Sequence, residues 1–235
     1  MNTVRRLVRE QVAPRAAAID AEKRFPEDVL QHFAEVGLLG LTIDEELGGF
    51  GAPMELLVEV VMEIAAVCAN SANILTQQAL ACRPLMLAGS AEQKAGWLPK
   101  LASGASLCSF ALTEAEAGSD NQSMRTRARR VGDTYVLEGS KVFCTISQLM
   151  TVFARAQDDP EGEGLVALVL ELPTEGFRVD RLEDKMGLNG SPTAQVAFSG
   201  VEVLPRRAND AGCQGDANSG GNERNSKGSN CSRVA

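Results

Sequence analysis

Apolar positions in the first hundred residues recur at helical spacing. Between Pro26 and Gly40 they fall three and four residues apart, and Glu27 and Asp28 complement the positive end of a helix that starts there. A second helix is predicted from Pro53. One broad apolar face runs along it, formed by Leu56, Leu57, Val60, Val61, Ile64 and Cys68. Because each such helix must bury one face, the pattern predicts a helical bundle.

Two further helices are predicted before residue 105. The first spans about residues 72–88, with an interruption at Pro84, and its apolar stripe is interpreted as core. Ser90 and Gln93 then have the spacing of a capping box, in which each residue caps the backbone of the other. They start a short helix that Pro99 should end, because proline lacks the N–H that the next turn needs.

After Gly104 the apolar period changes from helical to extended. Eight short strands are predicted, at about residues 107–112, 124–131, 134–138, 141–145, 151–156, 165–172, 177–182 and 194–203. Strands that are separated by turns and not by helices are typical of a sandwich or barrel. The predicted fold class is therefore α+β: an N-terminal α-helical bundle over residues 1–105, followed by a middle antiparallel β sandwich or barrel over residues 106–206.

The last segment changes character again. Asn209–Ala235 is rich in glycine, asparagine and serine, and Val234 is its one large aliphatic residue. A segment with so little apolar surface cannot offset the entropy lost on ordering its backbone. Residues 207–235 are therefore predicted to form a disordered tail that belongs to neither domain.

Composition and charge narrow the classes of function. A net charge of −8 disfavours general binding to nucleic acid or to anionic membranes. No apolar run reaches the ~20 residues of a membrane helix. The N-terminal segment carries Arg5, Arg6 and Arg9 where a signal peptide would be apolar. We therefore expect a cytoplasmic protein.

The positions of cysteine, histidine and arginine disfavour disulfide, metal, hydrolase and nucleic-acid sites. The six cysteines show no paired spacing, so reduced thiols are expected. The single histidine, His32, excludes most histidine-based metal sites and a hydrolase triad, and it is interpreted as a partly solvated helix residue. Arg125, Arg127 and Arg129 alternate with small residues, which favours the solvent face of a strand over a nucleic-acid patch.

The segment Phe110–Asp120 is the strongest candidate for chemistry. It reads F-A-L-T-E-A-E-A-G-S-D, so an apolar strand runs out into a turn of small residues. Such a turn lets backbone N–H groups and hydroxyls approach a ligand closely. Composition alone leaves two interpretations open, a ligand-binding turn and an ordinary exit from a strand.

This segment resembles the flavin-binding signature of the acyl-CoA dehydrogenase family, from which it departs only in having Ala115 for proline. Further blocks of the chain are similar to the same family, in the same order. They are Phe25–Gly49, Glu92–Lys94, Leu98–Gly104, Leu137–Lys141 and Glu183–Thr193. Several ordered motifs in one chain are more specific than any one of them.

The resemblance implies FAD as cofactor and assigns its contacts. Phe110, Leu112, Thr113, Gly118 and Ser119 would lie along the edge of the flavin, and Ser119 would also border the bound acyl-CoA thioester. A W-I-T tripeptide covers one flavin face in the family. The residues at those positions here are Phe143, Cys144 and Thr145.

Two departures from the family pattern stand nearby. Ile146–Met150 differs from the family's continuation of W-I-T and is shorter by about three residues. Asn189 stands where the family commonly has arginine, which removes a permanent charge and a bidentate donor. We expect the segment that this arginine would order to be looser.

The activity that the resemblance implies is oxidation of acyl-CoA to 2-enoyl-CoA in fatty acid metabolism, with FAD as hydride acceptor. Electron-transfer flavoprotein and a homo-oligomer are implied as partners. The family's base is usually a glutamate in a C-terminal helical domain, and no residue of Met1–Arg206 corresponds to it. Glu114 and Glu116 are interpreted as solvated loop carboxylates. The chain alone is therefore expected to be truncated and inactive.

Other functions remain open on this sequence. Nitroalkane oxidases and flavin-dependent monooxygenases are similar flavoenzymes on the same fold. A different class of hypothesis is a non-catalytic remnant or interaction protein that keeps the two-domain scaffold. Flavin bound by the purified protein would favour the flavoenzymes, and bleaching of that flavin by acyl-CoA would separate the two classes more sharply.

Overall fold

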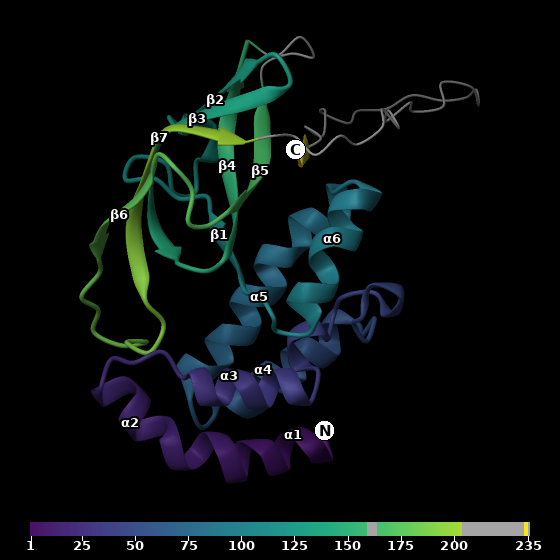
Figure 1. The fold of residues 1–235 in the computed structure, drawn as a ribbon. Helices are drawn as coiled ribbons and strands as arrows, with labels where there is room; N and C mark the ends of the chain where they lie inside the picture. Colours follow the sequence, from purple (N-terminus) through teal and green to yellow (C-terminus); the bar gives the residue numbers. More distant parts are fainter. Residues whose placement is uncertain (159–163, 204–232, 235) are drawn as a thin grey trace, which may run out of the picture.

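The computed structural model describes residues 1–158, 164–203 and 233–234. Helices form one part of the molecule and a curled sheet forms the other (Figure 1). The helices are α1 (Asn2–Leu7), α2 (Ala16–Ala21), α3 (Glu27–Glu35), α4 (Met54–Ala65), α5 (Ala69–Ala88) and α6 (Ala91–Ala102). None of the helices in the described ranges is long and apolar enough to span a bilayer.

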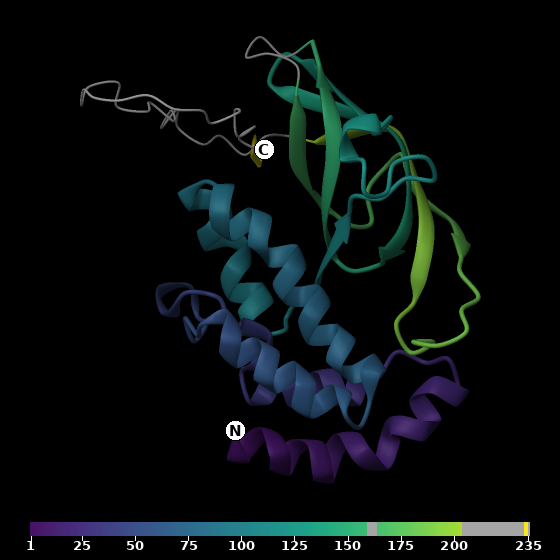
Figure 2. The same ribbon diagram turned by 180° about the vertical axis from the view of Figure 1, so that it is seen from behind.

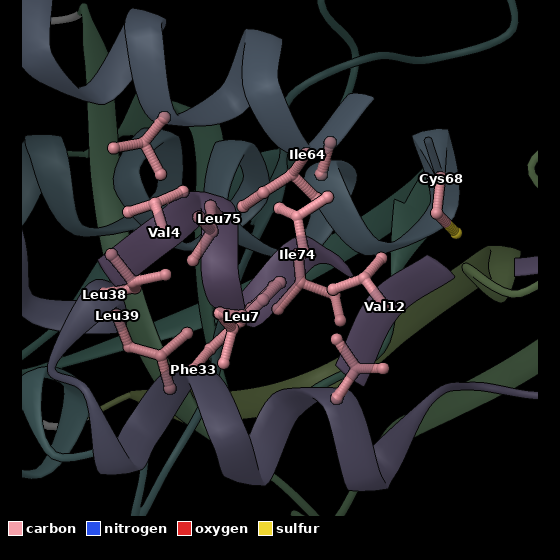
Figure 3. Close-up of a cluster of buried hydrophobic side chains, with 14 of the residues drawn as sticks. Val4, Leu7, Val12, Phe33, Leu38, Leu39, Ile64, Cys68, Ile74 and Leu75 are labelled. Carbon is pink, nitrogen blue, oxygen red and sulfur yellow. The ribbon is translucent and has the colours of Figure 1, made fainter. Parts of the chain in front are cut away.

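A helical core surrounds the first part of α5. Its buried side chains come from the N-terminal segment, α3, the turn after α3, α4 and α5 (Figure 3). Phe33 and Ile64 are fully buried there, on the apolar faces that helical spacing predicts. The predicted capping box is confirmed, since Gln93 N–H donates to Ser90 Oγ (3.1 Å) and Ser90 N–H donates to Gln93 Oε1 (2.8 Å).

Two predictions about proline are wrong. α5 continues through Pro84 to Ala88, and α6 continues through Pro99 to Ala102. Each proline removes one backbone donor from its helix. The turns that follow are held by buried side chains, Leu85 in α5 and Leu101 in α6. Tertiary packing outweighs the lost hydrogen bond at both places.

The strands are β1 (Cys108–Ala111), β2 (Arg127–Val131), β3 (Thr134–Thr145), β4 (Leu149–Gln157), β5 (Leu165–Glu171), β6 (Phe177–Leu182), β7 (Thr193–Val203) and β8 (Arg233–Val234). They form one sheet in the order β6-β7-β3-β2-β4-β5-β8, with β1 added alongside β4. The predicted fold class, a helical domain followed by a β domain, is confirmed.

The sheet is mixed and not wholly antiparallel. β4 runs parallel to β1 and to β2. Its direction is opposite to that of β3, and β2 is antiparallel to β3, so β4 pairs in parallel when it lies next to β2. The two strands predicted at 134–138 and 141–145 are one strand, β3. Gly139 does not end it, and its backbone (φ +138°) instead brings β3 close to Thr126.

Helix α5 joins the two parts of the molecule. Beyond the helical core, it packs with α6, β1 and β4 in a cluster that includes Cys82, Leu98, Cys108 and Leu149. Figure 2 shows α5 passing beside the start of β1. The side chain of Gln78 connects both sides, since it donates to Leu101 O and accepts from Cys108 N–H, each at 2.9 Å.

Several sequence predictions can be located in this fold. Four cysteines are buried free thiols, as predicted: Cys68, Cys82, Cys108 and Cys144. Arg127 and Arg129 lie on the exposed side of β2, also as predicted. The predicted tail lies outside the described residues, except for Arg233 and Val234, which pair with Val166 and Ala167 as β8.

Candidate functional site

The motif segment forms a tight turn beyond β1. Glu114 N–H donates to Ala117 O (3.0 Å) and Ala117 N–H donates to Glu114 O (3.3 Å), which leaves Ala115 and Glu116 exposed at the tip. Gly118 and Ser119 follow and are exposed as well. The turn therefore presents backbone and hydroxyl groups at the surface of the β domain.

A bulge in β3 brings the second predicted segment to this turn. The pairing of β3 with β7 shifts between Lys141 and Cys144, and Phe143 has a left-handed backbone (φ +59°). Val142 N–H turns away from β7 and donates to Thr113 O at 2.9 Å. Bulges often redirect a strand next to a functional site. This bulge brings Phe143–Thr145 together with Leu112 and Thr113.

The predicted site residues present different groups. The Phe143 ring is 67% exposed, whereas the Cys144 side chain is fully buried in the β core. A ligand could reach only the backbone of Cys144, because its side chain is buried, and this burial also raises the pKa of its thiol to about 12. Thr145 and Leu112 are half-buried. The Phe110 ring packs on Phe153, with ring centroids 5.0 Å apart.

Two features of the turn favour a bound group. A side chain at Gly118 would meet nothing within 4 Å, so packing inside the described chain does not require glycine there. The Thr113 hydroxyl has no hydrogen-bond partner among the described residues, although its backbone is held by Val142. The open position at Gly118 and the free hydroxyl at Thr113 each fit the flavin contacts that are predicted at these residues.

The interpretation of Glu114 as a solvated carboxylate is wrong. Glu114 is 8% exposed, and its Oε1 accepts a hydrogen bond from Lys141 Nζ at 2.8 Å. Burial alone would raise the pKa of this carboxyl, but hydrogen bonds from Lys141, Thr126 and Arg125 outweigh burial and lower the pKa. Glu116 is exposed, as predicted, and it pairs with Arg125 at the surface.

A cavity of about 420 Å³ lies between the helices and the sheet and reaches the end of β3 at Thr145. Thr145 is the one predicted site residue that lines it. The helical wall includes Asn73, Ile74 and Gln77 of α5, and Ser191 lies opposite. The sequence prediction missed this wall because α5 was interpreted as core. Asn73 and Gln77 stand four residues apart on one face of a mainly apolar helix, and that polar spacing is the signal that could have found it.

Two family descriptions match the chain in succession. Residues 1–105 match the acyl-CoA dehydrogenase N-terminal domain, and residues 109–201 match the acyl-CoA dehydrogenase middle domain. The chain belongs to the acyl-CoA dehydrogenase family. Probable acyl-CoA dehydrogenase fadE25 of Mycobacterium leprae is 38% identical over 204 residues, which are 86% of this chain and 52% of that protein. The chain thus spans about half the length of the curated relatives it matches.

Solved structures of the acyl-CoA dehydrogenase family share the fold. Butyryl-CoA dehydrogenase from Megasphaera elsdenii is 30% identical with a TM-score of 0.78, over 85% of this chain and 54% of that one. A glutaryl-CoA dehydrogenase from Mycobacterium smegmatis, in complex with FADH2, is 28% identical with a TM-score of 0.80, over 87% and 52%.

The loop that carries Asn189 is fixed to the helices by hydrogen bonds. Asn189 N–H donates to Asp20 Oδ1 (3.1 Å), and Gly190 N–H donates to Asn70 Oδ1 (2.8 Å). The Asn70 side chain also donates to Asp20. These bonds tie the loop before β7 to α2 and α5.

Proposed function

We propose that this chain supplies the N-terminal and middle domains of an acyl-CoA dehydrogenase-type flavoprotein. FAD would lie against the turn Leu112–Ser119 and the bulge Phe143–Thr145. The observation that carries the proposal is the hydrogen bond from Val142 N–H to Thr113 O, because it joins the two family motifs into one surface. When bound, FAD supplies an acceptor for the hydride from the β carbon of an acyl thioester.

The residues on this surface have distinct roles in the proposal. Thr113 offers a free hydroxyl, and Gly118 leaves room for a group that approaches the backbone. Phe143 offers an exposed aromatic ring for stacking, without the indole N–H of the family's tryptophan. Cys144 contributes through its backbone only, since its thiol lies in the core.

The acyl-CoA substrate would enter through the cavity beside Thr145. The cavity is lined by apolar residues such as Ile74 and Leu30, together with polar groups from α5 and the loop before β7. A mostly preformed space with a few polar groups is typical of sites for small organic ligands. Ser119 would border the thioester. In an enzyme of this type that completes the reaction, electron-transfer flavoprotein would take the electrons onward.

Removal of the α proton is not assigned to a carboxylate of the turn. Glu114 is paired with Lys141 in the interior, and Glu116 is exposed and paired with Arg125. A general base needs to reach the proton in a site with little water. Neither carboxylate of the turn is therefore assigned as the base. We further propose that these 235 residues bind flavin but do not turn over acyl-CoA by themselves.

The test is to load the purified chain with FAD and mix it anaerobically with short-, medium- and long-chain acyl-CoAs. We expect FAD to stay bound to the protein and the absorbance band of oxidised FAD to persist. Failure to bind FAD would contradict the flavoprotein assignment. Rapid bleaching with formation of enoyl-CoA would instead show that a base exists within the chain.

A further inference from the structure

A buried ion pair lies directly beneath the turn. Lys141 is fully buried, and its Nζ donates to Glu114 Oε1 (2.8 Å) and to Leu112 O (2.9 Å). One ammonium group therefore contacts the backbone and the side chain of the turn at once. Lys141 is also the last residue of β3 before the bulge.

Glu114 extends the connection to a third segment. Its Oε2 accepts from Arg125 N–H (2.7 Å) and its Oε1 also accepts from Thr126 N–H (2.9 Å). Thr126 is fixed in turn, since its hydroxyl donates to Ser140 O (3.2 Å) and its carbonyl accepts from Arg155 N–H (2.8 Å). The carboxylate is thus satisfied on both oxygens within the protein.

The pair is costly to bury and is not needed to fill the core. Taking two charges out of water carries a large desolvation penalty, and apolar residues of similar volume often stabilise such positions as well or better. Burial lowers the pKa of the Lys141 ammonium, against the opposing effect of Glu114. A charged pair at this place is better explained by the groups that it positions than by stability.

We propose that Lys141 and Glu114 are positioning residues that hold the Thr113–Ser119 turn against the β3 bulge, and so fix the surface that receives the flavin. The inference rests on the proposed function. Neither side chain is required to touch the cofactor. Their role is to fix the Leu112 carbonyl, the Thr113 hydroxyl and the Phe143 ring relative to one another.

The test compares FAD affinity in the full chain with Lys141→Met, Glu114→Gln and Leu168→Ala. Leu168 is fully buried in the same β core on β5, which does not pair with β3, so its truncation is a control for lost stability. All variants are titrated at a temperature at which circular dichroism shows them folded. We expect Lys141→Met and Glu114→Gln to weaken FAD binding by about tenfold or more, as removal of a supporting partner does at other sites. Leu168→Ala should stay within about twofold of wild type.

The outcomes separate this inference from the proposed function. If wild type binds FAD and Lys141→Met binds it equally well, the inference falls and the proposed function stands. An equal loss in Leu168→Ala also overturns the inference, because lost stability would then account for the effect. If wild type binds no FAD, both are overturned.

If Lys141→Met does not fold, hydrogen exchange on the wild-type protein tests the inference instead. The Arg125 and Thr126 amides should be protected as strongly as the β3 ladder, because they donate to a fixed carboxylate. Added FAD should also slow exchange across Thr113–Ser119. Exchange of both amides at the rate of an exposed turn would overturn the proposal.

Discussion

Phe143 has a backbone conformation that a bulky residue adopts rarely. Its φ of +59° lies in the left-handed region, and such strain amounts to about 1–3 kcal/mol. Strained residues persist where their surroundings fix them. Here the preceding residue bonds to Thr113 and the following residue is fully buried in the β core. The ring is left exposed at the surface where the flavin is proposed to bind.

Thr113→Val tests the free hydroxyl of the turn. The substitution removes one hydroxyl at nearly constant volume, so the fold should be retained. We expect FAD binding to weaken by about 0.5–1.5 kcal/mol, the net contribution of a typical hydrogen bond. Fluorescence titration measures the FAD affinity of both proteins. Unchanged affinity would mean that the Thr113 hydroxyl makes no contact with the cofactor.

The stability of the chain should fall in acid partly through Glu114. Its pKa is lowered by folding, so its contribution is present above the usual carboxyl pKa of 4.5 and is lost as pH falls through the folded value. Urea unfolding from pH 6 to pH 3 should show a shallower loss for Glu114→Gln than for wild type. At neutral pH the variant should be less stable by about 3–5 kcal/mol, because Lys141 loses its partner. Parallel pH profiles would rule out this contribution.

Strand β3 is the element on which the site depends. It pairs with β7 and β2 and carries Lys141 and the bulge. Gly139 allows it to pass close to the backbone that carries Thr126. An added Cβ would lie 2.7 Å from Thr126 Cα, and φ is +138°. A close approach of this kind explains a glycine inside a strand.

Gly139→Ala should therefore disturb both the sheet and the turn. We expect the free energy of unfolding to drop by about 1–3 kcal/mol, the range for overpacking a filled site. Gly164→Ala is the matched control, because its added Cβ would meet no atom of the described residues within 4 Å. Thermal unfolding of both variants measures the difference. Equal stability of the two would show that β3 can shift away from Thr126 at no cost.

Sequence patterns located most elements, and their misses have local causes. Helical spacing and the capping box predicted α4 and the start of α6, because both signals arise within one element. The bulge at Phe143 and the burial of Glu114 depend on partners far along the chain. The spacing of apolar residues therefore does not predict them. The family motif marks the turn as a candidate site, but it does not reveal which of its carboxylates is buried.

The whole molecule leaves an apolar groove between α4 and α5 open to solvent. Met54, Val58, Met62 and Leu80 contribute to it, and Met62 is 65% exposed. Contiguous apolar surface of this kind favours association.

The chain should therefore self-associate as its concentration rises, and Met62→Lys should reduce that association. Glu59→Gln changes the net charge by the same amount on the exposed side of α4 and is the control. Sedimentation velocity over a range of concentrations measures the average mass. A monomer at every concentration, or equal effects of both substitutions, would contradict the prediction.

The parallel pairing of β1 with β4 has a consequence for biosynthesis. Leu107 N–H bonds to the side chain of Gln148, which lies 41 positions later in the chain, and β1 begins beside this contact. At about 5–20 residues per second, a ribosome needs about 2–8 s to make the intervening segment. Through that interval β1 extends from a nearly complete helical domain with no strand to pair with. Slow codons between β1 and β4 would lengthen the time for which this edge is open to chaperones or to another nascent chain.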